Sequence, residues 1–284
     1  FRTNHTERQQ SMNLNTEKVK YDDATSDALA NACRTVAQNI DNALPPLKNS
    51  LTTALEEFKG HYADVAAANI DTTISDGRDI ASIFRQLADV VDRLKESAHK
   101  ENENRDLMYH YEHDLGGFRK WWVETFGGEP PKPTSYKPDT SIDTTSLGHR
   151  ESTETRSGSM TVSSARPSTV RALSNTLANL GTSFDAEPGK LRNLSTEFMV
   201  KCQWGSVDAE NLISTFEAWN KSNANDKTWL GIVADTFEKY GSSSQIITVA
   251  NSTLEGAISA AGVSTERHDL EVPAPAVVGM STTS

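Results

Sequence analysis

Long apolar runs are missing from this chain of 284 residues. No stretch reaches the roughly 18 consecutive apolar residues that a membrane-spanning helix needs, so we expect no transmembrane segment. The first twenty residues are polar and have no apolar centre, which predicts no secretory signal peptide. Positive charge is also scarce, since 28 Lys and Arg stand against 39 Asp and Glu and the formal net charge is −11. This balance argues against nucleic acid or an anionic membrane surface as the main partner, because both attract Lys and Arg.

Cysteines and catalytic motifs are scarce as well. Cys33 and Cys202 cannot form a disulfide-rich framework, and each falls on an apolar stripe, so we predict two small buried core residues. No phosphate-binding loop, dinucleotide fingerprint or Ser-His-Asp order is recognisable. His110 and His113 lie one helical turn apart, but no third ligand follows at a defined spacing, which indicates solvated side chains. We therefore predict no catalytic residue, no cofactor, no metal site and no enzymatic activity.

Apolar residues at helical spacing dominate the first half of the chain. From Leu29 to Phe58 they recur at steps of three or four, and a second stripe continues to about His113. The second helix would then be on the order of 75 Å long. Gly60, in the turn Phe58-Lys59-Gly60, is expected to end the first helix in a left-handed conformation. Pro45-Pro46 predicts a break or kink in the first helix.

A second pair of helical segments follows a polar stretch. Residues 127–165 are rich in Pro, Ser, Thr and charge, which is typical of a flexible linker. Helical spacing then begins near Ser168, is interrupted at Pro188-Gly189, and continues from Leu191 to Cys202. After the turn Trp204-Gly205 a returning stripe runs from Leu212 to Tyr240. A short weaker helix is expected around residues 246–261. No segment alternates apolar and polar residues over a convincing length, so we predict no sheet.

Together these patterns predict an all-α fold of two long antiparallel helical hairpins, resembling a four-helix bundle, joined by a disordered linker. We place a disordered lead at 1–20, the first hairpin with an aromatic C-terminal helix at 21–126, the linker at 127–165, the second hairpin with a short extra helix at 166–262, and a disordered tail at 263–284. A single hairpin cannot bury both sides of its stripe and must pack against another. The linker permits the hairpins to pack on each other, or each to recruit a separate partner.

The turns and the helices around them resemble the Trp-x-Gly (WXG, ESAT-like) family, the small helical hairpins exported by type VII secretion systems of actinobacteria and firmicutes. The second half is the clearer match, with Trp204-Gly205 at the turn and with Phe216 and Trp219 in the returning helix. The first half is similar to a divergent copy, with Phe58-Lys59-Gly60 at its turn.

The sequence departs from the family pattern at three places, and one of them is the first turn, where Phe58 stands in place of Trp. Trp204-Gly205 lacks the residue that separates Trp from Gly in the family triplet. The family's export signal, a Tyr followed four positions later by an acidic residue, is absent. Tyr109 is followed by Asp114 at five positions and Tyr240 by Ser244 at four. Export of this chain would therefore need a signal from a partner.

The resemblance implies a non-enzymatic protein of a type VII secretion locus, either a secreted substrate or the delivery and partner-binding region of an effector. It would reach the outside or the cell surface by a route without a signal peptide, after residence in the cytoplasm. Its expected partners are a small WXG-like helical hairpin or a second copy, and the secretion machinery. The apolar side chains expected to bind them are Phe84, Leu87, Val91, Leu94, Phe216, Trp219, Leu230, Phe237, Trp121 and Trp122.

Two other functions stay open on the sequence. One is a cytosolic adaptor or chaperone that holds a secreted effector before export. The other is the N-terminal fragment of a toxin enzyme whose catalytic domain lies beyond residue 284. The aromatic segment that contains Trp121 and Trp122 either folds back onto the bundle or forms an exposed docking or membrane-interface element.

Overall fold

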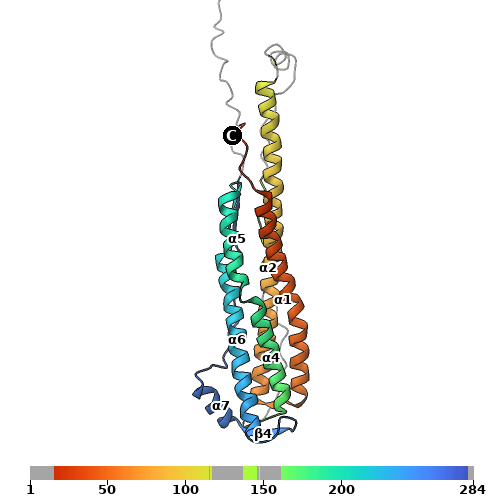
Figure 1. Ribbon diagram of the computed structural model, residues 1–284, viewed down its shortest axis with the longest axis vertical. Coiled ribbons are helices and arrows are strands. Elements are labelled where there is room, and N and C mark those ends of the chain that lie inside the picture. Colours follow the sequence, from red (N-terminus) through yellow and green to blue (C-terminus); the bar gives the residue numbers. More distant parts are fainter. Residues whose placement is uncertain (1–15, 115, 117–136, 146, 148–160, 281–284) are drawn as a thin grey trace, which may run out of the picture.

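The computed structural model describes residues 16–114, 116, 137–145, 147 and 161–280. Its long helices run along an elongated molecule, and α7 lies at one end (Figure 1). The prediction of a predominantly all-α fold is confirmed. The helices are α1 (Asp23–Glu57), α2 (His61–His113), α4 (Pro167–Phe184), α5 (Glu187–Lys201), α6 (Glu210–Glu238) and α7 (Asn251–Ala260).

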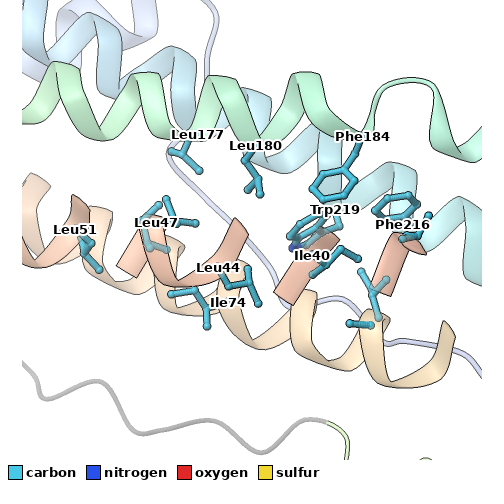
Figure 2. Close-up of a cluster of buried hydrophobic side chains, with 14 of the residues drawn as sticks. Ile40, Leu44, Leu47, Leu51, Ile74, Leu177, Leu180, Phe184, Phe216 and Trp219 are labelled. Atoms are coloured by element: carbon cyan, nitrogen blue, oxygen red, sulfur yellow. The ribbon is translucent and has the colours of Figure 1, made fainter. Parts of the chain in front are cut away.

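The core lies between five helices, α1, α2, α4, α5 and α6. α1 packs mainly on α2 and α4 mainly on α6, and α1 also contacts α4 and α5. Figure 2 shows side chains from α1, α2, α4 and α6 meeting around Trp219, which lies beside Phe184 and Ile40. The rings of Trp219 and Phe216 stack with centroids 6.0 Å apart. The apolar stripes of both halves are therefore buried against each other within one chain.

A break or a kink is predicted at Pro45-Pro46, and α1 is continuous through both prolines, so the break does not occur. Both prolines are exposed, whereas Leu44 and Leu47 on either side are buried in the core. Water can solvate the carbonyl groups that lose their helical donors on this face. The packing of the flanking leucines therefore outweighs the two lost hydrogen bonds.

The predicted end of α2 at His113 is confirmed.

The second interruption lies slightly earlier than predicted. α4 ends at Phe184 and α5 begins at Glu187, so Pro188 falls in the first turn of α5. The first turn is where proline is favoured, because its missing N–H group would have no helical partner there. The break itself is confirmed, but Pro188 begins the new helix instead of ending the old one.

Short strands pair at both ends of α6, so the prediction of no sheet is wrong. One antiparallel sheet has the order β1-β2-β4, and a two-stranded sheet pairs β3 with β5. Strands of two to four residues are too short to show alternation in a sequence. Their bounds are β1 (Lys59–Gly60), β2 (Val162–Ala165), β3 (Gly205–Asp208), β4 (Ile247–Ala250) and β5 (Ala276–Gly279).

Gly60 has a different role from the one predicted. Its φ of +95° and ψ of −172° lie outside the left-handed helical region, and it is the N-cap of α2, whereas Phe58 caps the end of α1. A Cβ at this position would collide with the backbone carbonyl oxygen of Val162 on β2. Glycine is thus required by its positive φ and by the close approach of a strand.

Part of the expected linker is held against α2. The Arg93 Nε group donates to the Asp139 carbonyl at 2.6 Å, and the Gln86 amide exchanges hydrogen bonds with the Asp143 backbone at 2.6 and 2.8 Å. β2 also falls inside the predicted linker. The expectation of a disordered linker is therefore wrong for these residues, because side chains of α2 recognise an extended backbone, which leaves no periodic sequence signal.

The expected disordered tail also has a defined position as far as residue 280. We call residues 263–280 the strap. Its side chains Val263, Leu270, Val272 and Val277 pack against the core, and its last part forms β5. Polar composition concealed this order, since an extended segment needs only a few apolar contacts and one neighbouring strand to be held.

Candidate functional site

The Trp204-Gly205 turn joins α5 to α6 through β3. Trp204 is buried, and its Nε1 group donates to Ser97 Oγ on α2 at 2.9 Å. The Arg105 guanidinium lies 5.8 Å from the centre of the Trp204 ring, within the range of a cation–π contact. The tryptophan therefore fastens the α5–α6 turn to α2. The other turn aromatic, Phe58, is also buried, and its ring lies edge-on to Phe237 at 6.3 Å.

Segments from both ends of the described chain meet at the Trp204 turn. The Gln203 N–H group donates to the Lys20 carbonyl at 3.0 Å, and the Met280 N–H group donates to the Trp204 carbonyl at 3.1 Å. Next to them, Val19 donates its N–H to Asn102 Oδ1 on α2 at 2.7 Å. The motif that the sequence singled out is thus a junction of the lead, α2, β3 and the strap.

We predict that Gly205→Ala destabilises the chain by about 1–3 kcal/mol, the usual cost of overpacking. A Cβ here would lie 2.9 Å from Leu94 Cδ2 and 3.0 Å from the Val278 carbonyl oxygen. Urea unfolding followed by circular dichroism measures the change. The matched control is Gly256→Ala inside α7, where a Cβ meets nothing within 4 Å and should stabilise the chain slightly. Equal stability of the two variants would contradict the close fit of the junction.

The residues expected to bind a partner lie in the interior of the chain. All those on α2 and α6 are fully buried, so in this structure they pack against the rest of the same chain. Contact with a second protein through them would require the bundle to open. They are Phe84, Leu87, Val91, Leu94, Phe216, Trp219, Leu230 and Phe237. Trp121 and Trp122 lie outside the described residues.

A different set of large apolar side chains is exposed near the junction. α2 continues past the neighbouring helices (Figure 1), and Leu107 and Tyr109 on its last turns are 60% and 47% exposed. Met199 and Val200 at the end of α5 are exposed as well. The sequence analysis missed these residues because it considered only the apolar stripe of α2. Near the end of α2 the buried side includes Met108, whereas Leu107 and Tyr109 lie off it. We call the exposed apolar residues at this end of the molecule the apolar tip; they are Leu107, Tyr109, Met199, Val200, Val278 and Met280.

A buried polar network lies below the junction, between α2, α6 and the strap. The Arg267 Nη1 atom is 2.6 Å from Asp226 Oδ2, and these side chains are 3% and 1% exposed. Asp226 Oδ1 accepts from Asn69 Nδ2 at 2.8 Å and from Trp229 Nε1 at 2.9 Å. Asn223 Oδ1 accepts a further hydrogen bond from Arg267 at 3.0 Å. The network joins three separate stretches of sequence, around Asn69, Asp226 and Arg267, and these stretches carry no motif, so no sequence signal revealed it.

Several carboxylates line a hollow of about 330 Å³ between α2 and the strap, namely Asp76, Asp79, Asp269 and Glu271.

His110 and His113 are exposed, and the ring of His113 stacks on the ring of Tyr109 with centroids 4.3 Å apart. Within the described ranges, no group of three or more His, Cys, Asp or Glu side chains is placed to hold a metal ion.

Both cysteines are buried, as predicted. Burial raises the pKa of the Cys33 thiol to about 12, and burial also raises the pKa of the Cys202 thiol. The Cys202 Sγ atom lies 3.4 Å from the Asp22 carbonyl oxygen, at the edge of the Trp204 junction. Both thiols are therefore protonated at neutral pH and serve as small packing residues.

None of the helices in the described part of the chain is both long and apolar enough to cross a membrane. Comparisons with protein-family models, with curated proteins and with solved structures give no match to this chain.

Proposed function

We propose that this chain is a non-enzymatic protein of a type VII secretion locus, acting as a secreted substrate or as the delivery and partner-binding region of a larger effector. One observation carries the proposal. We interpret the helices as two hairpins, one of α1 with α2 and one of α4 and α5 with α6. Their apolar stripes cover each other within one chain. This is the arrangement that two single-hairpin proteins of the WXG type would make as a dimer. The Trp204-Gly205 turn supports it as the corner of the second hairpin.

The surface left for a partner is the apolar tip. Large apolar side chains gathered at one end of a molecule favour association, because covering them removes apolar area from water. A suitable partner is an amphipathic helix of a small hairpin protein. Leu107 and Tyr109 lie on α2, which continues to His113, so a partner helix could pack side by side with the last turns of α2. Such a partner could also supply the Tyr-x-x-x-acidic export signal that this chain lacks.

We expect Leu107→Glu together with Val200→Glu to weaken binding of that partner at least tenfold and to abolish export. The thermal midpoint should stay unchanged, because both side chains are mostly exposed. The measurements are co-purification with the small hairpin protein encoded nearby, and a secretion assay in a type VII-competent host.

The matched control is Tyr240→Glu with Ile246→Glu, two equally exposed apolar residues that follow α6 at the opposite end of that helix from β3. The control should bind and be exported normally. Export that persists after the tip variant, or after deletion of the small hairpin gene with no other partner co-purifying, would contradict the proposal.

A further inference from the structure

Two polar pairs join α2 to α6 on successive helical turns. Asn69 Nδ2 on α2 donates to Asp226 Oδ1 on α6 at 2.8 Å, and one turn along α2 the Thr73 Oγ1 atom lies 3.2 Å from Asn223 Oδ1. All four residues are at most 6% exposed. A step of four residues along α2 thus corresponds to a step of three residues back along α6, so the two helices are antiparallel in one register. We call these two contacts the register pairs.

A third contact agrees with this register without being polar. Gly77 follows Thr73 by one turn of α2, and a Cβ at Gly77 would lie 3.0 Å from Trp219 Cζ2, in the ring that Figure 2 shows beside Ile40. Small buried residues recur along α2, however, so a large ring could pack beside several of them. They include Ala63, Ala66, Ala67, Ala81 and Ala88. The fit of this ring therefore does not determine the alignment of the helices by itself.

The apolar contacts of α6 leave its alignment open as well. From Phe216 to Phe237 buried positions recur at alternating steps of three and four, so a slide by one turn, about 5.4 Å, moves one buried position to where another was. The same slide would separate Asp226 from Asn69, and a buried polar group that loses its partner raises the free energy of the chain. The register pairs therefore distinguish alignments that apolar burial does not.

We propose that the register pairs are the specificity determinant of α2–α6 packing, so that α2 accepts α6 in this one alignment while apolar burial supplies the stability. A single buried polar residue fixes the register of paired helices in coiled coils in the same way. Because Asp226 also pairs with Arg267 at 2.6 Å, the start of the strap is tied to the same alignment. The register pairs lie inside the chain, so this role does not depend on the secretion function.

The test uses the full chain labelled with 5-fluorotryptophan, because each fluorine resonance reports the surroundings of one indole ring. Trp219 Nε1 donates to the Thr73 carbonyl and Trp229 Nε1 donates to Asp226, so both rings lie beside the register pairs. Asn69→Leu with Thr73→Val removes the α2 side of both pairs and leaves the charge pair between α6 and the strap intact. We expect a second signal from Trp219 with roughly a tenth of the intensity or more, because a second alignment becomes populated. The unchanged chain should give one signal for each ring.

The matched control is Asn31→Leu with Thr35→Val, which makes the same changes at the same spacing on the exposed side of α1. Thr35 Oγ1 donates to the Asn31 carbonyl at 2.8 Å, and Thr73 Oγ1 lies 3.0 Å from the Asn69 carbonyl, so the local helix contacts are alike. The control should keep one signal for each ring near the register pairs.

Circular dichroism shows whether the variants keep their helix content. Should the double variant on α2 lose it, Thr73→Val alone removes one pair at nearly unchanged volume, and a smaller second signal from Trp219 is expected. A single sharp Trp219 signal in the folded α2 variant would overturn the proposal. Loss of helix content in both α2 variants would overturn it too, because the pairs would then hold the fold together instead of selecting its alignment.

Discussion

Trp219→Ala is expected to lower the free energy of unfolding by about 3–5 kcal/mol, the range for removing a large core aromatic. Trp219 is fully buried, stacks on Phe216, and lies 5.7 Å from the ring of Phe184 on α4. Its Nε1 group donates to the Thr73 carbonyl of α2 at 2.9 Å. The substitution therefore opens a cavity where α1, α2, α4 and α6 meet, and it leaves a backbone acceptor without its donor.

Urea unfolding of Trp219→Ala and of Trp219→Phe measures this effect. Phe keeps most of the ring volume and loses the hydrogen bond, so it should cost clearly less than Ala. Trp204→Ala is a useful comparison, because Trp204 joins the α5–α6 turn to the last part of α2 and lies outside the core cluster that contains Trp219. A Trp219→Ala variant with unchanged stability would mean that the two halves of the chain do not pack on each other at this residue.

Arg267→Ala should destabilise the chain by about 3–5 kcal/mol, because it leaves the Asp226 carboxylate buried without a counter-charge. Asp226 would still accept hydrogen bonds from Asn69 and Trp229, but a charge at 1% exposure is poorly solvated by them alone. The matched control is Lys201→Ala, which breaks an ion pair with Glu197 in which both side chains are nearly half exposed. That exposed pair is screened by water and should contribute nothing measurable.

The double variant Asp226→Leu with Arg267→Met separates the charge from the packing. Replacing both partners by apolar residues removes the unpaired charge, so it should recover most of the stability lost in Arg267→Ala. Urea unfolding of the single and double variants forms a cycle. A double variant as unstable as the sum of the two single substitutions would show that Arg267 and Asp226 act independently, which contradicts the direct pairing of their charges.

The helices were predictable because their signal is periodic and long. The apolar spacing gave α2 its end at His113, and it placed Phe84, Leu87, Phe216 and Trp219 on buried faces. The role of those residues could not be read from spacing, because an apolar stripe looks the same whether a second protein covers it or the rest of the chain does.

Features held by a few specific contacts escaped prediction. The strap is held by one buried charge pair, by four residues of β5 and by a few apolar contacts with the core, and none of these leaves a repeating pattern. The paired prolines of α1 led to the opposite error, because a helix break was expected there and none occurs. The burial of Leu44 and Leu47 outweighs the local cost of the prolines. The Trp204 turn was recognised as important, but its neighbours, Ser97, Arg105 and Lys20, are distant in sequence and could only be found in three dimensions.

The most direct test of the account is whether the two halves pack on each other within one molecule. Small-angle X-ray scattering with in-line light scattering on the full chain answers it. We predict a monomer that scatters as one elongated rod. α2, with 53 residues, spans about 80 Å of the length of this rod. An obligate dimer with swapped halves, or a monomer that scatters as two separated helical units, would contradict it.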